Sequence, residues 1–215
     1  MNLFPKNKVE LREIKKFIVI FYIIGFIGFI IPFTPKIFRY ITPLALLISV
    51  YLLALYHTDY NRKSIFVFSI IYLSGFFIEV LGVKSGLIFG PYKYGYSLGP
   101  GIFGTPLIIG INWLFLVYTC TSIIERFKLN TFLKVVLASC LMVVYDLVLE
   151  QVAGKMDMWY WEGSHVPIKN YIAWYIISFI FISLFQVMKM KTTNKLSLVL
   201  FVCQFTFLFA LMIFL

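Results

Sequence analysis

The sequence has few of the charged residues that a water-soluble protein needs. Only 13% of its 215 residues are charged, whereas 61% are hydrophobic. A typical soluble domain is about 25% charged and about 45–50% apolar. The polar side chains are therefore too few to cover a water-soluble globule, and the composition predicts a membrane protein.

Cysteine and histidine are also scarce, which argues against common metal and nucleophile sites. The three cysteines, Cys120, Cys140 and Cys203, lie inside apolar runs without the spacing of metal ligands, so we expect buried, inert thiols. The two histidines, His57 and His165, fall on opposite sides of the predicted membrane. We therefore expect no metal site, and no Ser-His-Asp or Cys-His set at one level.

What the sequence has instead is a series of long apolar runs. A helix needs roughly 20 apolar residues to cross about 30 Å of hydrocarbon. We predict seven spans, at residues 14–33, 40–56, 64–83, 105–124, 131–150, 168–187 and 196–215. The second is short or begins at Pro43, and the first lacks a cleavage site, so we expect it to remain as a span. The gaps leave no room for a soluble domain, so residues 1–215 are predicted to form one all-α, polytopic membrane domain.

The net charge of +10 comes from basic residues in the short connections, which argues against a nucleic-acid partner. If the N-terminus is inside, six basic residues lie outside, and the other thirteen, including Lys6 and Lys8, lie inside. The outside set is Lys36, Arg39, Lys84, Lys93, Lys155 and Lys169. The positive-inside rule then predicts N-in and C-out. We expect a bacterial or archaeal cytoplasmic membrane, with the lipid bilayer as a partner.

Three ionisable side chains fall within the predicted spans: Glu79, Asp146 and Glu150. Carboxyls inside a membrane are costly and are candidates for function by default. Asp146 and Glu150 are four residues apart, so they share a helix face. Glu79 lies in the third span, and Asp146 and Glu150 lie in the fifth. Both of these spans run from the inside to the outside, which puts the three carboxyls in the outer half of the membrane. The structural alternatives are that Glu150 lies at the interface and that Glu79 forms a bridge to Lys84.

Other polar and aromatic side chains are expected at the same depth. Asn112 and Trp113 lie about two turns into the fourth span, and Asn170 and Trp174 lie near the start of the sixth. The longest connections, 84–104 and 151–167, should close over this end, and loops of this length are often functional. They carry Lys84, Tyr92, Tyr94, Asp157, Trp159, Trp161 and His165. His57 and Asp59 fall at the opposite end, and we interpret them as boundary residues.

The chemistry that suits such a site is acid catalysis on an alkene. A carboxyl in a low dielectric holds its proton more tightly and can act as a general acid. Aromatic faces stabilise cations through their quadrupole. A carboxylate partner then directs water to the carbocation or removes a different proton. The run Gly99-Pro-Gly-Ile-Phe-Gly104 matches G-x-G-x-x-G by letter only, since no strand is predicted before it.

A resemblance to a known family begins with the stretch Glu79-Val-Leu-Gly-Val-Lys-Ser-Gly-Leu-Ile-Phe-Gly-Pro-Tyr-Lys-Tyr94. It resembles the signature of the membrane carotenoid-biosynthesis family, which includes carotenoid 1,2-hydratases such as bisanhydrobacterioruberin hydratase and gamma-carotene hydratase. Further matches are Leu98-Gly-Pro100, Gly104-Thr-Pro-Leu107 leading to Trp113, Asp146, Trp159-Tyr-Trp161, Val166-Pro-Ile-Lys-Asn170 and Trp174. The resemblance covers roughly residues 75–178. It departs where Glu150-Gln151 replaces Asp-Pro and where Ala173 replaces Gly.

The resemblance implies a hydro-lyase that needs no cofactor. Water would add across the terminal C1–C2 double bond of an acyclic carotenoid ψ end group, giving a tertiary hydroxyl. We expect Glu79 or Asp146 to be the acid, and the other to orient water together with Glu150. The expected substrate-binding residues are Tyr92, Tyr94, Asn112, Trp113, Trp161, Asn170 and Trp174. Other enzymes of the carotenoid pathway are candidate partners.

Two other functions remain open from the residues alone. A carotenoid cyclase would use the same cation but capture it with an internal alkene, and its pocket would exclude water. A non-enzymatic carotenoid-binding or transport protein would give no product, and its carboxyls would line a path through the membrane.

Overall fold

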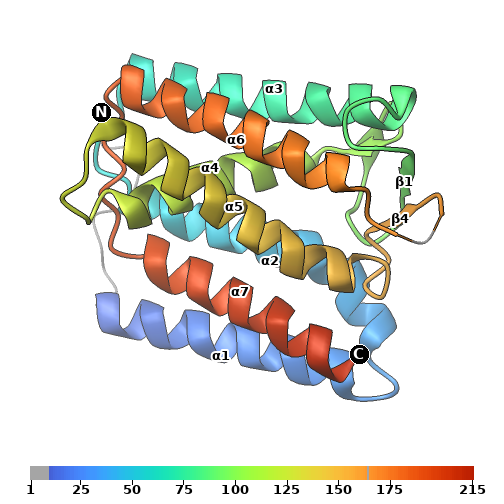
Figure 1. Ribbon diagram of the computed structural model, residues 1–215. Helices are drawn as coiled ribbons and strands as arrows, with labels where there is room; N and C mark the ends of the chain where they lie inside the picture. Colours follow the sequence, from blue (N-terminus) through green and yellow to red (C-terminus); the bar gives the residue numbers. More distant parts are fainter. Residues whose placement is uncertain (1–9, 164) are drawn as a thin grey trace.

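The computed structural model describes residues 10–163 and 165–215, which fold into a bundle of seven helices (Figure 1). The helices are α1 (Leu11–Ile30), α2 (Pro35–Tyr56), α3 (Arg62–Ser85), α4 (Ile108–Ile124), α5 (Thr131–Ala153), α6 (Ile168–Val187) and α7 (Ser197–Phe214). The described residues also form four short strands, β1 (Tyr92–Tyr94), β2 (Gly101–Ile102), β3 (Thr105–Pro106) and β4 (Trp159–Trp161). The all-α class is confirmed, while Lys6 and Lys8 of the charge count lie outside the described residues.

Several helix boundaries differ by a few residues from the sequence-based expectation, and the starts of α2 and α4 have a local explanation. α2 begins at Pro35, and Pro43 lies inside it rather than at its start. Pro35 occupies the first turn, where its fixed φ suits a helix and its missing N–H costs nothing. α4 begins at Ile108 rather than at residue 105, because Thr105 and Pro106 pair with β2 as strand β3.

Local capping explains where the helix that carries Glu79 begins and ends. At the start of α3, Asn61 Oδ1 accepts from the Ser64 amide at 2.8 Å, and Ser64 Oγ accepts from the Asn61 amide at 2.9 Å. At its end, Gly86 takes the left-handed conformation at φ 62°, which favours glycine. The chain therefore turns sharply after α3 and returns toward it as β1.

The surface of the bundle is apolar, as a lipid-facing surface would be. Five helices, α2, α3, α5, α6 and α7, are long and apolar enough to cross a membrane, and α4 is a shorter apolar helix. Side chains such as Ile20, Phe66 and Ile180 are more than half exposed. These features support integration in a membrane. The count of seven spans and the N-in orientation stay predictions.

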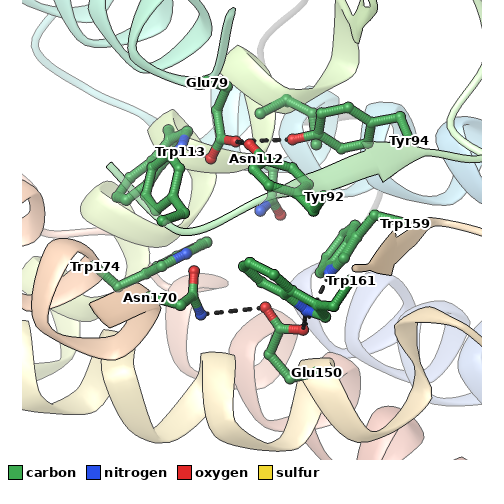
Figure 2. Close-up of a pocket in the computed structure, with 12 residues that line it drawn as sticks. Glu79, Tyr92, Tyr94, Asn112, Trp113, Glu150, Trp159, Trp161, Asn170 and Trp174 are labelled. Atoms are coloured by element: carbon green, nitrogen blue, oxygen red, sulfur yellow. Dashed lines mark hydrogen bonds between the residues drawn. The ribbon is translucent and has the colours of Figure 1, made fainter. Parts of the chain in front are cut away.

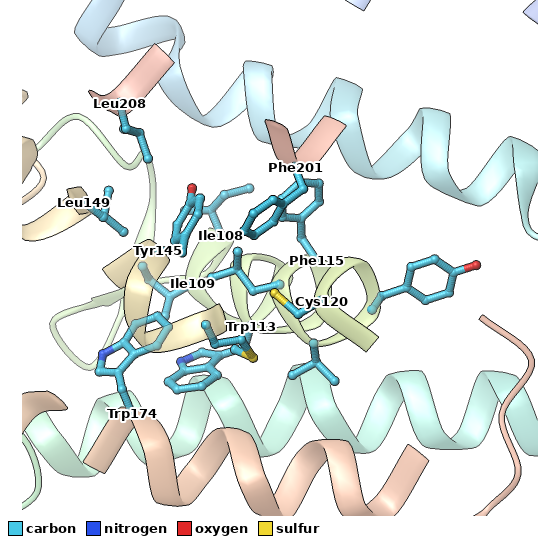
Figure 3. Close-up of a cluster of buried hydrophobic side chains, with 14 of the residues drawn as sticks. Ile108, Ile109, Trp113, Phe115, Cys120, Tyr145, Leu149, Trp174, Phe201 and Leu208 are labelled. Carbon is cyan, nitrogen blue, oxygen red and sulfur yellow. The ribbon is translucent and has the colours of Figure 1, made fainter. Parts of the chain in front are cut away.

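The core of the bundle is organised around α4. This helix packs against α2, α3, α5, α6 and α7, while α1 packs on α7 and α2 (Figure 1). Trp113, Phe115 and Cys120 on α4 are fully buried beside Tyr145 of α5 and Phe201 of α7 (Figure 3). A buried helix between lipid-facing neighbours can present polar groups to an enclosed site.

The cysteines only partly follow expectation. Cys120 is buried, Cys203 is partly exposed and Cys140 is exposed, and all three are free. The prediction of a buried thiol is therefore wrong for Cys140, because this residue lies on the outward face of α5.

The two long connections meet at one end of the bundle. β1 and β4 pair antiparallel, with Tyr92 opposite Trp161 and Tyr94 opposite Trp159. Figure 1 shows this pair at the end where α3 and α5 finish and α4 and α6 begin. We call β1 and β4 together the strand lid.

Candidate active site

Beneath the strand lid lies a small enclosed cavity, which we call the acid cavity (Figure 2). Its volume, measured for the centre of a water molecule, is about 20 Å³. The lining comes from α3, α4, α5, α6 and both strands of the lid, and comprises Glu79, Phe89, Tyr92, Tyr94, Ile109, Asn112, Trp113, Glu150, Trp159, Trp161, Asn170 and Trp174. One water needs about 10–15 Å³ on this measure, so the cavity has room for about one.

On one side of the cavity, Glu79 of α3 accepts three hydrogen bonds. Tyr92 and Tyr94 donate their hydroxyls to Oε2 at 2.5 and 2.8 Å. Trp113 donates its indole N–H to Oε1 at 3.0 Å. The carboxyl is 5% exposed, so these donors replace the water that it has lost.

Glycines on the same face of α3 let these partners approach. Gly75 and Gly82 lie one turn before and about one turn after Glu79. A Cβ on Gly75 would lie 2.8 Å from Trp113 Cβ, and a Cβ on Gly82 would lie 3.3 Å from the Tyr92 hydroxyl. Larger residues at either position would push a donor away from the carboxyl.

Across the cavity, Glu150 of α5 also accepts three hydrogen bonds. Trp159 and Trp161 donate their indole N–H groups to Oε2 at 3.0 and 2.8 Å. Asn170 Nδ2 donates to Oε1 at 3.2 Å. Glu150 is 9% exposed and also lines an open outer groove with Lys155, so it lies between the acid cavity and the outer surface.

Asp146 lies one turn before Glu150 and is fully buried. Asn170 Nδ2 donates to its Oδ2 at 2.9 Å, so a single amide group bridges the two carboxyls. Within the part of the chain that the structure describes, Oδ1 of Asp146 has no hydrogen-bond partner. Asp146 is not among the residues that line the acid cavity. It therefore lies behind Asn170, and two of the three carboxyls reach the cavity directly.

The strand lid explains why each glutamate is held by a pair of aromatic side chains. Alternate residues of a strand point to the same face. Tyr92 and Tyr94 therefore reach Glu79 together, and Trp159 and Trp161 reach Glu150 together. The intervening Tyr160 points away and donates to Asp157 Oδ1 at 2.7 Å.

Aromatic faces form much of the remaining wall. Trp113 and Trp174 stack with their ring centroids 4.2 Å apart and an interplanar angle of 22°. The rings of Tyr92 and Trp161 are also in contact, with their centroids 5.0 Å apart. Such faces carry the negative part of the ring quadrupole, so a transient cation in this cavity would be stabilised.

The two tyrosines of the lid stay neutral donors. Burial, and then the neighbouring Glu79 carboxylate, raise the pKa of Tyr92 and the pKa of Tyr94 above the ordinary value. Neither phenol ionises near neutral pH, so each keeps its proton available to Glu79.

Asn112 differs from the other polar residues of the cavity. It is partly exposed to the cavity, and its side-chain amide forms no hydrogen bond with any described residue. An amide that faces an aromatic cavity needs a hydrogen-bond partner there. A water or a ligand in the acid cavity would supply one.

The structure brings all the expected site residues to this end of the bundle, with Asp146 one shell further back. Lys84 does not bridge to Glu79, because its Nζ lies 4.6 Å from the centroid of the Phe103 ring. His165 is exposed. Among described residues, no group of three or more His, Cys, Asp or Glu is placed to hold a metal ion.

The opposite end of the bundle holds His57 and Asp59. His57 is buried, rather than at a boundary with water, because Nδ1 is 2.9 Å from the Tyr118 hydroxyl. Asp59 lies 3.9 Å from Lys191 Nζ. Both residues are remote from the acid cavity.

Sequence reasoning missed three lining residues, Phe89, Ile109 and Trp159. Trp159 is one of the two indole donors to Glu150. The alternation Trp-Tyr-Trp, like Tyr-Lys-Tyr at 92–94, is typical of a strand with two rings on one face. That signal could have identified both the lid and Trp159.

Comparison with known families identifies the chain. A family model described as "Carotenoid biosynthesis protein" matches residues 40–215, which include every residue of the acid cavity. Neither the comparison with curated proteins nor that with solved structures finds a match. The chain therefore belongs to the carotenoid biosynthesis protein family.

Proposed function

We propose that this protein is a carotenoid 1,2-hydratase, which adds water to the terminal C1–C2 double bond of an acyclic ψ end group. One observation carries the proposal. Two carboxyls on separate helices face a small, aromatic-walled cavity with room for about one water. Membership of the carotenoid biosynthesis family supports a carotenoid as the substrate.

Glu79 is the candidate acid because two of its three partners adapt to either protonation state. A tyrosine hydroxyl can both donate and accept a hydrogen bond. Tyr92 and Tyr94 can therefore stabilise the carboxylate as donors and can turn to accept from a protonated Glu79. A site that tolerates both states suits a group that gives up and recovers a proton in each turnover.

Glu150 is the candidate base because its three partners are all N–H groups. The indoles of Trp159 and Trp161 and the Nδ2 of Asn170 donate and cannot accept. This set favours the carboxylate over the acid, since hydrogen bonds to the charged form stabilise it. A carboxylate beside the cavity can orient a water and take its proton.

The reaction balances with these two groups alone. Glu79 gives its proton to C2, the C1–C2 π electrons form the new C–H bond, and a tertiary cation remains at C1. Water attacks C1 through a lone pair and passes one proton to Glu150. Proton transfer from Glu150 back to Glu79 then restores the starting state.

The size and position of the acid cavity favour this reaction over the alternatives. A cyclase would need to exclude water from the cation, whereas this cavity has room for about one water beside the unpartnered amide of Asn112. A transporter would need carboxyls along a path through the membrane. In the described residues the three buried carboxyls gather at one end.

The test is expression in a lycopene-producing bacterium, with pigments analysed by mass spectrometry. Hydration adds the mass of one water for each reacted end group, whereas cyclisation leaves the mass unchanged. If lycopene alone is recovered, with neither a hydrated product nor an isomer separated by chromatography, both activities are excluded. The protein must be verified in the membrane, and the Glu79→Gln variant is the control.

A further inference from the structure

The acid cavity is too small to hold the hydrocarbon that it would act on. Its volume of about 20 Å³ accommodates about one water. A carotenoid end group is many times larger, so most of the substrate must lie outside this cavity but next to it.

A second cavity meets this requirement. It shares the walls Ile109, Asn112 and Trp159 with the acid cavity and extends beneath α2 toward α1 and α7. We call it the chain cavity. It has a volume of about 70 Å³ on the same measure, and Ile108, Leu149 and Leu208 form part of its wall (Figure 3). The unpartnered amide of Asn112 thus lies in the wall that the two cavities share.

The chain cavity suits a hydrocarbon because, away from Asn112 in the shared wall, polar groups around it are already engaged. The Tyr22 hydroxyl lies 2.9 Å from Ser49 Oγ and 3.4 Å from Gln204 Oε1. Thr42 Oγ1 donates to the Phe38 carbonyl at 3.0 Å. The remaining wall is mostly apolar, so a polyene would displace little bound water.

α2 provides a route from the bilayer into this cavity. Only Ser49 and Leu53 of its residues are buried, so the helix is weakly attached to the bundle. Pro43 lies inside α2 and removes one backbone hydrogen bond next to the cavity wall. Ala45 and Leu46, on the same stretch, line the cavity.

We infer that the chain cavity binds the polyene segment next to the reacting end group. This inference rests on the proposed function. The substrate enters from the bilayer beneath α2, and its C1–C2 bond passes Ile109, Asn112 and Trp159 to meet Glu79. The side-chain amide of Asn112 then forms a hydrogen bond with the water in the acid cavity. This hydrogen bond holds the water on the side of the shared wall away from the polyene.

A third cavity provides the rival location. It is lined by Val50, Ala54 and His57 of α2 at the opposite end of the bundle and has a volume of about 250 Å³. None of its lining residues belongs to the acid cavity. Size alone favours it, whereas a shared wall with the carboxyls favours the chain cavity.

Three tryptophan substitutions on α2 separate these possibilities. Ala45→Trp fills the chain cavity and Ala54→Trp fills the third cavity. Leu47→Trp is the matched control, since Leu47 is 43% exposed on the outer face of the same helix. Ala45→Leu is a milder filling variant, to be used if Ala45→Trp does not fold. Folding is checked by size-exclusion chromatography in detergent.

Each variant is measured for hydration in lycopene-producing cells and for lycopene retained after purification. Retention is measured in the Glu79→Gln background, so it does not depend on turnover. We expect Ala45→Trp to lower both hydration and lycopene retention by about 10²-fold, because the indole occupies the space of the polyene and the end group no longer reaches the acid. We expect Ala54→Trp and Leu47→Trp to leave both quantities unchanged. Unchanged retention in Ala45→Trp, or loss only in Ala54→Trp, would overturn the inference. If no variant, nor the wild type, hydrates lycopene, the proposed function fails, but retention still tests the cavity.

Discussion

The two sides of the acid cavity are built alike but hold their carboxyls differently. In the first half, α3 carries Glu79, β1 supplies two aromatic donors, and α4 supplies Trp113. In the second half, α5 carries Glu150, β4 supplies two aromatic donors, and α6 supplies Asn170. Trp113 and Trp174, one from each half, stack between them.

The difference lies in the chemistry of the donors on each strand. β1 presents two hydroxyls, which can reverse the direction of a hydrogen bond, whereas β4 presents two indole N–H groups, which cannot. The same helix–strand–helix arrangement thus supports a carboxyl that can rest protonated on one side and a carboxyl that rests as the carboxylate on the other. The contrast indicates a division into an acid half and a water-directing half.

The largest expected effect comes from removing either carboxyl. Glu79→Gln should lower hydration by about 10²–10⁴-fold, because no group remains to protonate C2. Glu150→Gln should lower hydration by a similar factor while still allowing reversible protonation. Protonated lycopene supplied to isolated membranes in D₂O should therefore acquire deuterium with Glu150→Gln but not with Glu79→Gln. Equal deuterium in both variants would abolish the distinction between the halves.

A smaller effect is expected from Trp161→Phe, which keeps the ring but removes one N–H donor to Glu150. A hydrogen bond to a charged group contributes about 1.5–3 kcal/mol, so hydration should fall by about 10- to 100-fold. Initial rates in membranes measure this. Tyr160→Phe, on the opposite face of the same strand, is the control. A loss confined to the control would contradict the role of β4.

Tyr94→Phe tests the other strand and should have less effect. Tyr92 and Trp113 still donate to Glu79, and loss of one donor makes the carboxyl easier to protonate. A neutral hydrogen bond contributes about 0.5–1.5 kcal/mol, which corresponds to about a 2- to 10-fold lower rate. A larger loss than that of Trp161→Phe, in the same membrane assay, would reverse the assignment of the halves.

The smallest effect on rate is expected for Asp146→Asn. Asp146 contacts Asn170 and does not line the acid cavity, so we expect about a twofold change, or ~0.5 kcal/mol. Its Oδ1 lacks a partner in the described residues, so an amide should leave the melting temperature unchanged or raise it. Complete loss of hydration by a folded variant would make Asp146, rather than Glu79, the acid.

The helices and the depth of the site could be predicted from the sequence, because both follow from simple periodic rules. Residues 168–187 were predicted as a span and form α6 with the same bounds. The rise of a helix also placed Glu79, Glu150, Asn112 and Asn170 at one level.

The short strands, and which of the three carboxyls line the acid cavity, could not be predicted in the same way. Each lid strand has three residues, and each pairs with a partner more than 60 residues away, so no local pattern reveals the register. Asp146 and Glu150 share a helix face, but only the position of Asn170 on α6 determines which one reaches the cavity. The local preference of Pro43 predicts a helix start, whereas α2 begins earlier, at Pro35, and continues through Pro43.

The order of partners along the chain has a consequence for biogenesis. Glu79 meets its hydroxyl donors 13 and 15 residues later, and Glu150 meets its indole donors 9 and 11 residues later. An unpaired carboxyl in a nascent transmembrane segment costs about 2.5–3.5 kcal/mol. The carboxyl of each acidic helix can therefore receive two of its hydrogen bonds from residues that leave the ribosome shortly after it.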